Sequence, residues 1–459
     1  MINPARAFTY LLAYIAILYL RPQEYVPALA EFPLVPVSLL FAAGLWLAAQ
    51  PKRFEASQHR LMLGLVSGMF VSTLFGAGFS AATNVVTEFG STLLLFYLVS
   101  TSVDSIQRFR QVCIVLTITS LVMAVHGLNQ ASNEEGIGWT GATMIEGRIR
   151  YIGFLNDPND LAMAFLMALP LALYVANGAA SYIVRNAFRA TGALSLYGIY
   201  LCNSRGGILG VLAMLLMYSS RRYGLLRSLL VAPILVAPIL LLAPSRMSEM
   251  SADEESAAGR VDAWFEGFEM FRAHPLLGVG KGMFVDYSWL TAHNSFVLAF
   301  AELGMYGYFF WLSILAVSAT MLAKIIRWSP VGKREVTLEP VLRDVDFRLA
   351  PTQWATPGTR PVDEAASTRP PWPDIQRAAS ALSYSMLGSL VAAFFLSRSY
   401  VSILYLLIAL IVAIYQMARL HWPTFEPVRA VDMLPRLFAM EVGSIVFLWL
   451  LTRVLLATS

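Results

Sequence analysis

Long apolar runs follow one another through most of this chain, and each approaches the length of a membrane-spanning helix. An α-helix rises about 1.5 Å per residue, so about 20 mostly apolar residues cross the hydrocarbon layer of a bilayer. Because such runs recur from one end of the chain to the other, the sequence predicts an all-α, polytopic transmembrane helical bundle of about 12–13 spans. The candidate spans lie near residues 6–20, 34–50, 61–80, 85–101, 110–130, 159–177, 188–203, 206–220, 225–243, 294–325, 379–397, 400–418 and 437–456.

The composition agrees with a membrane protein. Only 14% of the residues are charged, whereas soluble domains carry about 25%. We ascribe the formal net charge of +4 to Lys and Arg at the cytoplasmic side of the spans, and not to nucleic-acid binding. Cys113 and Cys202 lie in apolar runs without a CxxC motif, and the five histidines lack metal-ligand spacing, so we expect no metal and no other cofactor. The first apolar run lacks a small-residue cleavage site, so no cleavable signal is expected.

Basic residues predict the orientation of the spans. Lys and Arg gather at alternate span ends, which marks those ends as cytoplasmic if the N-terminus begins there. Arg205 breaks the trend, because it lies in a tight turn between two spans that separate Arg189 from Arg221. It is therefore predicted on the extracytoplasmic face. The residues that share the cytoplasmic side are Lys52, Arg53, Arg60, Arg108, Arg110, Arg185, Arg189, Arg221, Arg222, Arg227, Lys324 and Arg327.

Four regions follow from this topology. Residues 1–130 are N-terminal transmembrane helices, and residues 131–327 form a core that includes a large extracytoplasmic loop at 244–293, between the ninth and tenth spans. Residues 328–378 form a cytoplasmic insert whose proline density predicts a poorly ordered linker. Residues 379–459 are C-terminal transmembrane helices. No internal repeat of fixed period is evident.

Three side chains on the predicted outer face could carry chemistry: Arg205, Arg260 and His293. Guanidinium groups pair well with diphosphate oxygens, so two arginines without acidic neighbours form an anion site. His293 is expected in the first turn of the tenth span, with Thr291 available as the cap, where the helix dipole favours the neutral imidazole. A neutral imidazole can accept a proton from a hydroxyl nucleophile.

Simpler interpretations of the same residues remain open. Arg205 could be a snorkelling arginine at a helix end, Arg260 could pair with Asp262 or Glu266 on its own helix, and His293 could merely cap a span.

Further polar residues lie on the same predicted face. Arg148, Arg150 and Arg398 could attract an anionic headgroup or simply be exposed, and Asn294 could orient His293 or a substrate. Asn156 and Asn159 flank Pro158 at the mouth of the sixth span, where Asn156 or Asp157 is a plausible helix cap.

Two more features lie in or near the tenth span. Glu302 is a carboxylate within a predicted span, where burying its charge costs free energy, and it is a secondary functional candidate. Residues 278–282 resemble a phosphate loop but lack the Ser or Thr after Gly-Lys, so a plain turn is predicted.

In their order along residues 148–325, several short motifs resemble the O-antigen ligase and polymerase superfamily, the Wzy-C type integral membrane proteins. No single motif is specific, whereas the ordered set is. The N-terminal spans match only in being apolar, and the proline-rich insert and the last span lie outside the pattern. The motifs are GFLNDPND at 153–160, NSRGG at 203–207, Gly259-Arg260 with Trp264, HPLLGVG at 274–280, AHNSF at 292–296 and ELGMYG at 302–307.

The resemblance implies a GT-C-like glycosyltransferase of the bacterial inner membrane. Its donor would be an undecaprenyl-diphosphate-linked glycan, transferred at the periplasmic face without a metal and with inversion. By the same resemblance Arg205 and Arg260 would contact the diphosphate, and His293 would be the loop histidine. Substrate contacts would come from Arg148, Arg150, Asn156, Asn159, Asn294 and Arg398.

The acceptor separates the competing functions. We favour a ligase acting on lipid A–core, with a polymerase of lipid-linked repeat units for O-antigen or exopolysaccharide as the alternative, and protein glycosylation shares the motifs. A glycolipid transporter or flippase would place charges near the middle of the membrane and repeat its two halves, whereas the distinctive polar residues here gather at one face. A non-enzymatic glycan-binding partner of a polymer-export complex is a third class.

Overall fold

The computed structural model of the protein describes residues 4–49, 52–229, 250–329 and 372–458. Most of the predicted ninth span and of the proline-rich insert lies outside the described residues. Within them the structure is helical, with two isolated β-bridges, at Ile137–Thr143 and Ile145–Arg148, and no strand. This confirms the predicted all-α class.

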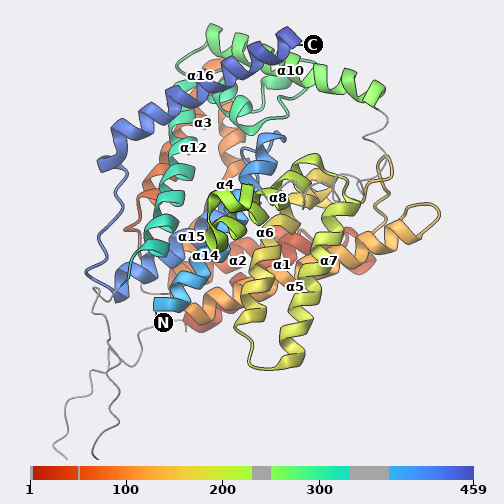
Figure 1. The fold of residues 1–459 in the computed structure, drawn as a ribbon, viewed down its shortest axis with the longest axis vertical. Coiled ribbons are helices and arrows are strands. Elements are labelled where there is room, and N and C mark those ends of the chain that lie inside the picture. The colour runs from red at the N-terminus through yellow and green to blue at the C-terminus, as the bar shows by residue number, and fades with distance from the viewer. Residues whose placement is uncertain (1–3, 50–51, 230–249, 330–371, 459) are drawn as a thin grey trace, which may run out of the picture.

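The helices follow the apolar runs closely (Figure 1). Short 3-10 turns precede or follow several of them, at Pro22–Glu24, Pro27–Leu29, Gly153–Leu155 and Val431–Met433. The α-helices are α1 (Pro4–Leu20), α2 (Leu34–Ala48), α3 (Ser57–Ala77), α4 (Phe79–Ser102), α5 (Ile106–Ser132), α6 (Pro158–Asn177), α7 (Tyr182–Leu201), α8 (Arg205–Tyr223), α10 (Met250–Ala273), α11 (Phe284–Tyr287), α12 (Ser295–Arg327), α14 (Trp372–Phe394), α15 (Ser402–His421) and α16 (Leu434–Thr458).

Seven helices in the described part of the chain are long and apolar enough to cross a membrane. They are α3, α4, α5, α6, α12, α15 and the last helix, and they make the chain a multi-pass membrane protein. Five more of the predicted spans form helices in the described residues, but α1 and α2 are shorter and α7, α8 and α14 are more polar. The predicted external loop at 244–293 contains the 24-residue helix α10.

The interior of the bundle is built around α12 and α15. Fifteen of the 20 residues of α15 are buried, and α12 packs against α3, α10, α14, α15 and α16. Close approach of α3 to α12 depends on small residues, because a Cβ on Gly68 would lie 2.7 Å from the Cα of Gly307. The last helix, α16, crosses α12 and α10 on the outside of the bundle (Figure 1).

A kink in α12 explains two of the glycine-containing motifs. Gly304 has φ 60° and ψ −169°, so the helical hydrogen bonds are interrupted there. The turn at 274–282 supplies replacements: the Gly280 N–H donates to the Glu302 carbonyl at 2.9 Å. The Glu302 carboxylate in turn accepts the Gly282 N–H at 2.9 Å. Residues 278–282 therefore form a turn that stabilises the kink by hydrogen bonds, and the Glu302 carboxylate stabilises that turn.

The ends of the predicted insert lie beside each other. α14 begins at Trp372, before the predicted start at 379, so the last residues of the predicted insert are helical. The Trp372 indole donates to the Trp328 carbonyl at 3.0 Å, and its ring packs against Trp328, Trp422 and Phe425. This aromatic cluster closes the end of the bundle opposite His293.

Candidate functional site

The turn between α7 and α8 has the form that the sequence predicts. α7 ends at Leu201 and α8 begins at Arg205, with the Ser204 hydroxyl accepting the Gly207 N–H at 3.2 Å as the helix cap. A Cβ on Gly206 would lie 3.3 Å from the Cα of Ala392. Arg205, which is exposed, therefore stands beside the end of α14.

Ser295, the first residue of α12, ties that helix to the connection between α14 and α15. Its hydroxyl is fully buried, donates to the Leu396 carbonyl at 2.6 Å and accepts the Arg398 N–H at 2.9 Å. The Ser399 hydroxyl donates to the Ser295 carbonyl at 2.7 Å. We call Ser295 and these three partners the serine junction. It fixes the backbone two residues after His293.

His293 lies just before α12 and not in its first turn, which corrects the prediction from sequence. Asn294 is the cap, and its side-chain oxygen accepts the N–H groups of Phe296 and of the following residue at 2.9 and 3.1 Å. Thr291, the predicted cap, donates instead to the Ser397 hydroxyl at 2.8 Å. His293 has φ 45°, a left-handed conformation that is uncommon outside glycine and is found often at functional sites.

α10 brings Arg260 to this end of the bundle. Trp264, one turn further along α10, is buried and packs edge-on against Phe394 of α14, with the ring centres 5.8 Å apart. A Cβ on Gly259 would lie 3.3 Å from the Leu290 side chain. The first contact holds this part of α10 against the end of α14, and the second holds it against the segment that carries His293.

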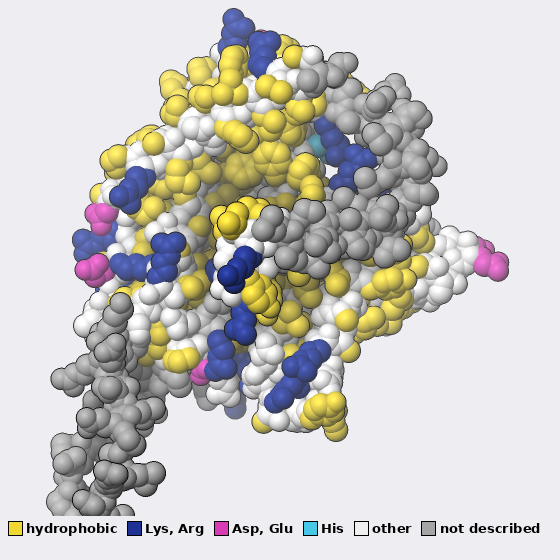
Figure 2. Space-filling model, viewed as in Figure 1, with side chains coloured by type: hydrophobic (Ala, Val, Ile, Leu, Met, Phe, Trp, Pro, Cys, Tyr) yellow, Lys and Arg dark blue, Asp and Glu magenta, His cyan; other side chains and the backbone are white. Residues whose placement is uncertain are grey.

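The environment of His293 favours its neutral form. Burial lowers the pKa of the imidazole, and the positive charges of Arg260 and Arg398 lower it further, against a smaller opposing effect of Asp157. The direction agrees with the sequence prediction, but the causes are burial and two guanidinium groups. Figure 2 shows a histidine side chain against Lys or Arg side chains at the edge of an apolar hollow.

Arg398 is held by a residue that the sequence analysis did not single out as functional. Its guanidinium Nε donates to the carboxylate of Asp160, in the first turn of α6. The Asp160 side chain is 8% exposed and that of Arg398 is 31% exposed. A carboxylate at the start of an apolar span could have marked Asp160 as functional. Its partner Arg398, however, lies 238 residues away in sequence.

Two of the predicted substrate contacts, Arg148 and Asn159, are brought together. The Arg148 guanidinium donates to the Cys202 carbonyl at 2.9 Å and to the Asn159 side-chain oxygen at 2.8 Å. The loop before α6 is thereby joined to the Arg205 turn. Asp157 caps α6 by accepting the Asn159 N–H at 2.7 Å, as one of the two predicted caps, and Asn156 is exposed.

Arg150 and Asn294 bond to the backbone around them. The Arg150 guanidinium donates to the Thr143 carbonyl at 2.5 Å and to the Thr143 hydroxyl at 3.0 Å, so it is held by its own loop. Asn294 is fully buried and caps α12, so its side chain supports the start of the helix and is not exposed at the site.

In the described part of the chain, no group of three or more His, Cys, Asp or Glu side chains could hold a metal ion. Positive charge at the His293 end comes from arginines on three separate elements: Arg205 on α8, Arg260 on α10 and Arg398 between α14 and α15. Such an arrangement can bind an oxyanion beside a neutral base.

Part of the chain matches a known protein family. A protein-family model described as O-antigen ligase matches residues 190–312, a stretch that contains Arg205, Arg260 and His293. No curated protein matches the chain. The match covers about a quarter of the chain, and over that stretch the chain is similar to the O-antigen ligase family.

Proposed function

We propose that this protein transfers a glycan from a polyprenyl diphosphate, of the undecaprenyl type, to an acceptor hydroxyl at the periplasmic face of the bacterial inner membrane. One observation carries the proposal: burial and the charges of two arginines lower the pKa of a half-buried histidine, which favours its neutral form. A third arginine, Arg205, begins a helix that packs on the end of α14 beside the serine junction.

The chemistry requires little beyond these groups. The acceptor oxygen attacks the anomeric carbon of the sugar opposite the diphosphate, and the bond from that carbon to the phosphate oxygen breaks. The diphosphate leaves with the bonding electrons, and the imidazole of His293 takes the hydroxyl proton. Attack from the opposite side inverts the anomeric centre.

Arginines would stabilise the negative charge on the departing diphosphate. A diphosphate is already a good leaving group, so stabilisation of its growing negative charge matters more than a general acid. We assign that role to Arg205 and Arg260, with Arg398 nearby, because preorganised cations stabilise the negative charge that develops in the transition state. Arg148 and Asn159 hold the loop that faces the same site.

Donor binding would also raise the pKa of His293. Without donor, the charges of Arg260 and Arg398 hold the pKa of His293 down. A bound diphosphate would offset those charges, so the imidazole would become more basic when the substrate arrives. The same cations that bind the donor would thereby prepare the histidine to accept the proton.

The test is a reaction with the purified full-length protein, lipid-linked oligosaccharide as donor, and either lipid A–core or a second lipid-linked repeat unit as acceptor. Product with the first acceptor indicates a ligase, and product with the second indicates a polymerase. His293→Ala should lower turnover by about 10²–10⁴-fold while donor binding persists. Full turnover in that variant would refute the assignment of the base, and donor movement across vesicles without product would indicate a transporter.

A further inference from the structure

A groove of about 820 Å³ lies between α6, α8 and α14, away from the site described above. It is lined by the second half of α6, the middle and second half of α8 and the first half of α14. The candidate site around His293 lies at the opposite ends of these three helices. Ligand pockets in proteins run from about 300 to 1,000 Å³. The groove is therefore large enough for a ligand of its own.

The body of the groove is apolar and opens sideways. Its walls include Leu169, Pro170 and Val211, and its rim includes the exposed side chains of Leu173, Leu196 and Leu215. In a chain that spans a membrane, exposed leucines beside a cavity face hydrocarbon chains. An acyl chain can therefore enter the groove directly from the bilayer.

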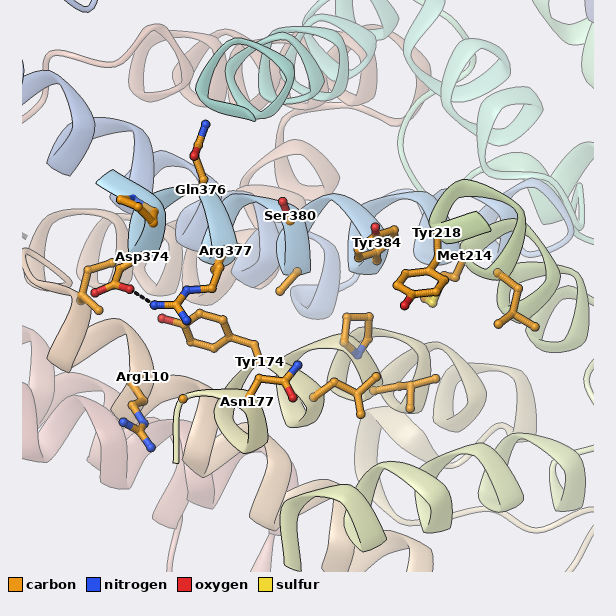
Figure 3. Close-up of a pocket in the computed structure, with 18 of the residues that line it drawn as sticks. Arg110, Tyr174, Asn177, Met214, Tyr218, Asp374, Gln376, Arg377, Ser380 and Tyr384 are labelled. Atoms are coloured by element: carbon orange, nitrogen blue, oxygen red, sulfur yellow. Dashed lines mark hydrogen bonds and ion pairs between the residues drawn. The ribbon is translucent and has the colours of Figure 1, made fainter. Parts of the chain in front are cut away.

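One end of the groove is charged and polar. Figure 3 shows Arg110, Arg377, Tyr174 and Asn177 at that end, with Arg377 paired to Asp374. This end thus holds two guanidinium groups and one carboxylate, and among the described residues Arg110 has no carboxylate partner. At the other end, Arg221 lies over the Tyr384 ring, 5.0 Å from its centre.

These features are those of a lipid with an anionic headgroup. Arg110 and the start of α14 belong to the side that the basic residues assign to the cytoplasm. Basic pockets between transmembrane helices on that side bind anionic lipid headgroups. We propose that the groove binds an anionic diacyl phospholipid of the cytoplasmic leaflet, with its phosphate between Arg110 and Arg377 and one acyl chain along the groove.

The proposal is independent of the transferase reaction, because it rests on residues at the other end of the bundle. A simpler role exists for Arg110. Its guanidinium carbon lies 3.8 Å from the position of a Cβ on Gly178, at the end of α6, where a cation is favoured by the helix dipole. A variant series can separate the two roles, because only lipid binding discriminates between headgroups.

The experiment uses the full-length protein in detergent and native mass spectrometry with phosphatidylglycerol and phosphatidylcholine of identical acyl chains. Wild type should retain phosphatidylglycerol preferentially. The double variant Arg110→Gln with Arg377→Gln should bind it about 25-fold more weakly, since each basic residue near an anionic lipid contributes about a factor of five. The control pair Arg189→Gln with Arg222→Gln removes exposed arginines of the same predicted side outside the groove, and should bind as wild type does.

A second variant tests the groove itself. Leu173→Trp fills it from the exposed rim and should weaken binding of both phospholipids. Equal retention of the two headgroups by wild type would overturn the proposal, as would unchanged binding in the double variant or in Leu173→Trp. Retention of a polyprenyl phosphate but not of phosphatidylglycerol would identify a polyisoprenoid occupant and would also overturn it.

Discussion

Replacing Ser295 by alanine removes both side-chain hydrogen bonds of the serine junction. The Leu396 carbonyl loses its donor at 2.6 Å and the Arg398 N–H loses its acceptor at 2.9 Å. Ser295 is fully buried, so water cannot readily replace the lost hydroxyl. A buried polar group left without a partner costs about 1–3 kcal/mol, and the two together should lower the free energy of unfolding by about 2–4 kcal/mol.

Ser313→Ala is the matched control. Ser313 lies in the same helix and is equally buried, but its hydroxyl has no hydrogen-bond partner among the described residues. Its loss should change the free energy of unfolding by less than about 1 kcal/mol. Both variants are measured by denaturant titration of the detergent-solubilised protein, followed by tryptophan fluorescence.

Turnover provides the second readout. The serine junction fixes the backbone of His293 and Arg398, and a displacement of about 1 Å in a catalytic group can cost about 100-fold in rate. Ser295→Ala should therefore lose turnover well beyond Ser313→Ala at a temperature where both are folded. Equal stability and equal turnover of the two variants would refute the role of the junction.

Three further changes have defined outcomes. Arg260→Gln removes a charge that lowers the pKa of His293, so the acid limb of the kcat/KM profile should move to higher pH, and an unmoved limb would contradict the proposed base. Asp160→Asn breaks a largely buried ion pair and should destabilise the protein by about 1–3 kcal/mol, as measured by denaturation. Gly304→Ala places a Cβ 2.4 Å from backbone at a φ of 60° and should cost about 2–4 kcal/mol, whereas Gly44→Ala, with open space around it, should stay within about 1 kcal/mol of wild type.

Local features of the chain were predictable because they depend on neighbouring residues. Apolar length marked the helices, and the Asn-Ser-Arg-Gly-Gly sequence marked a turn between two of them. Asp157 before Pro158 marked a helix start, since an acidic cap and a proline at the first position both satisfy the free N–H groups.

Contacts between distant segments were not predictable. Ser295 bonds to residues about a hundred positions away, and one sequence contains nothing that pairs them. The choice of cap depended on the same contacts: Thr291 and Asn294 are both good caps, but Thr291 is engaged by Ser397. The kink at Gly304 was hidden for a related reason, because a glycine in an apolar run does not reveal its φ.

The kink at Gly304 limits where this protein can be joined to a relative in a chimera. The backbone of α12 is continuous through Gly304. The N–H groups just after Gly304, however, donate to carbonyls of the turn at 274–282, which precedes α12 in the chain. The Met305 N–H, for example, donates to the Pro275 carbonyl at 2.9 Å. A chimera with a relative should therefore exchange residues 274–307 as one cassette, since a crossover inside that stretch would pair each half with a foreign counterpart.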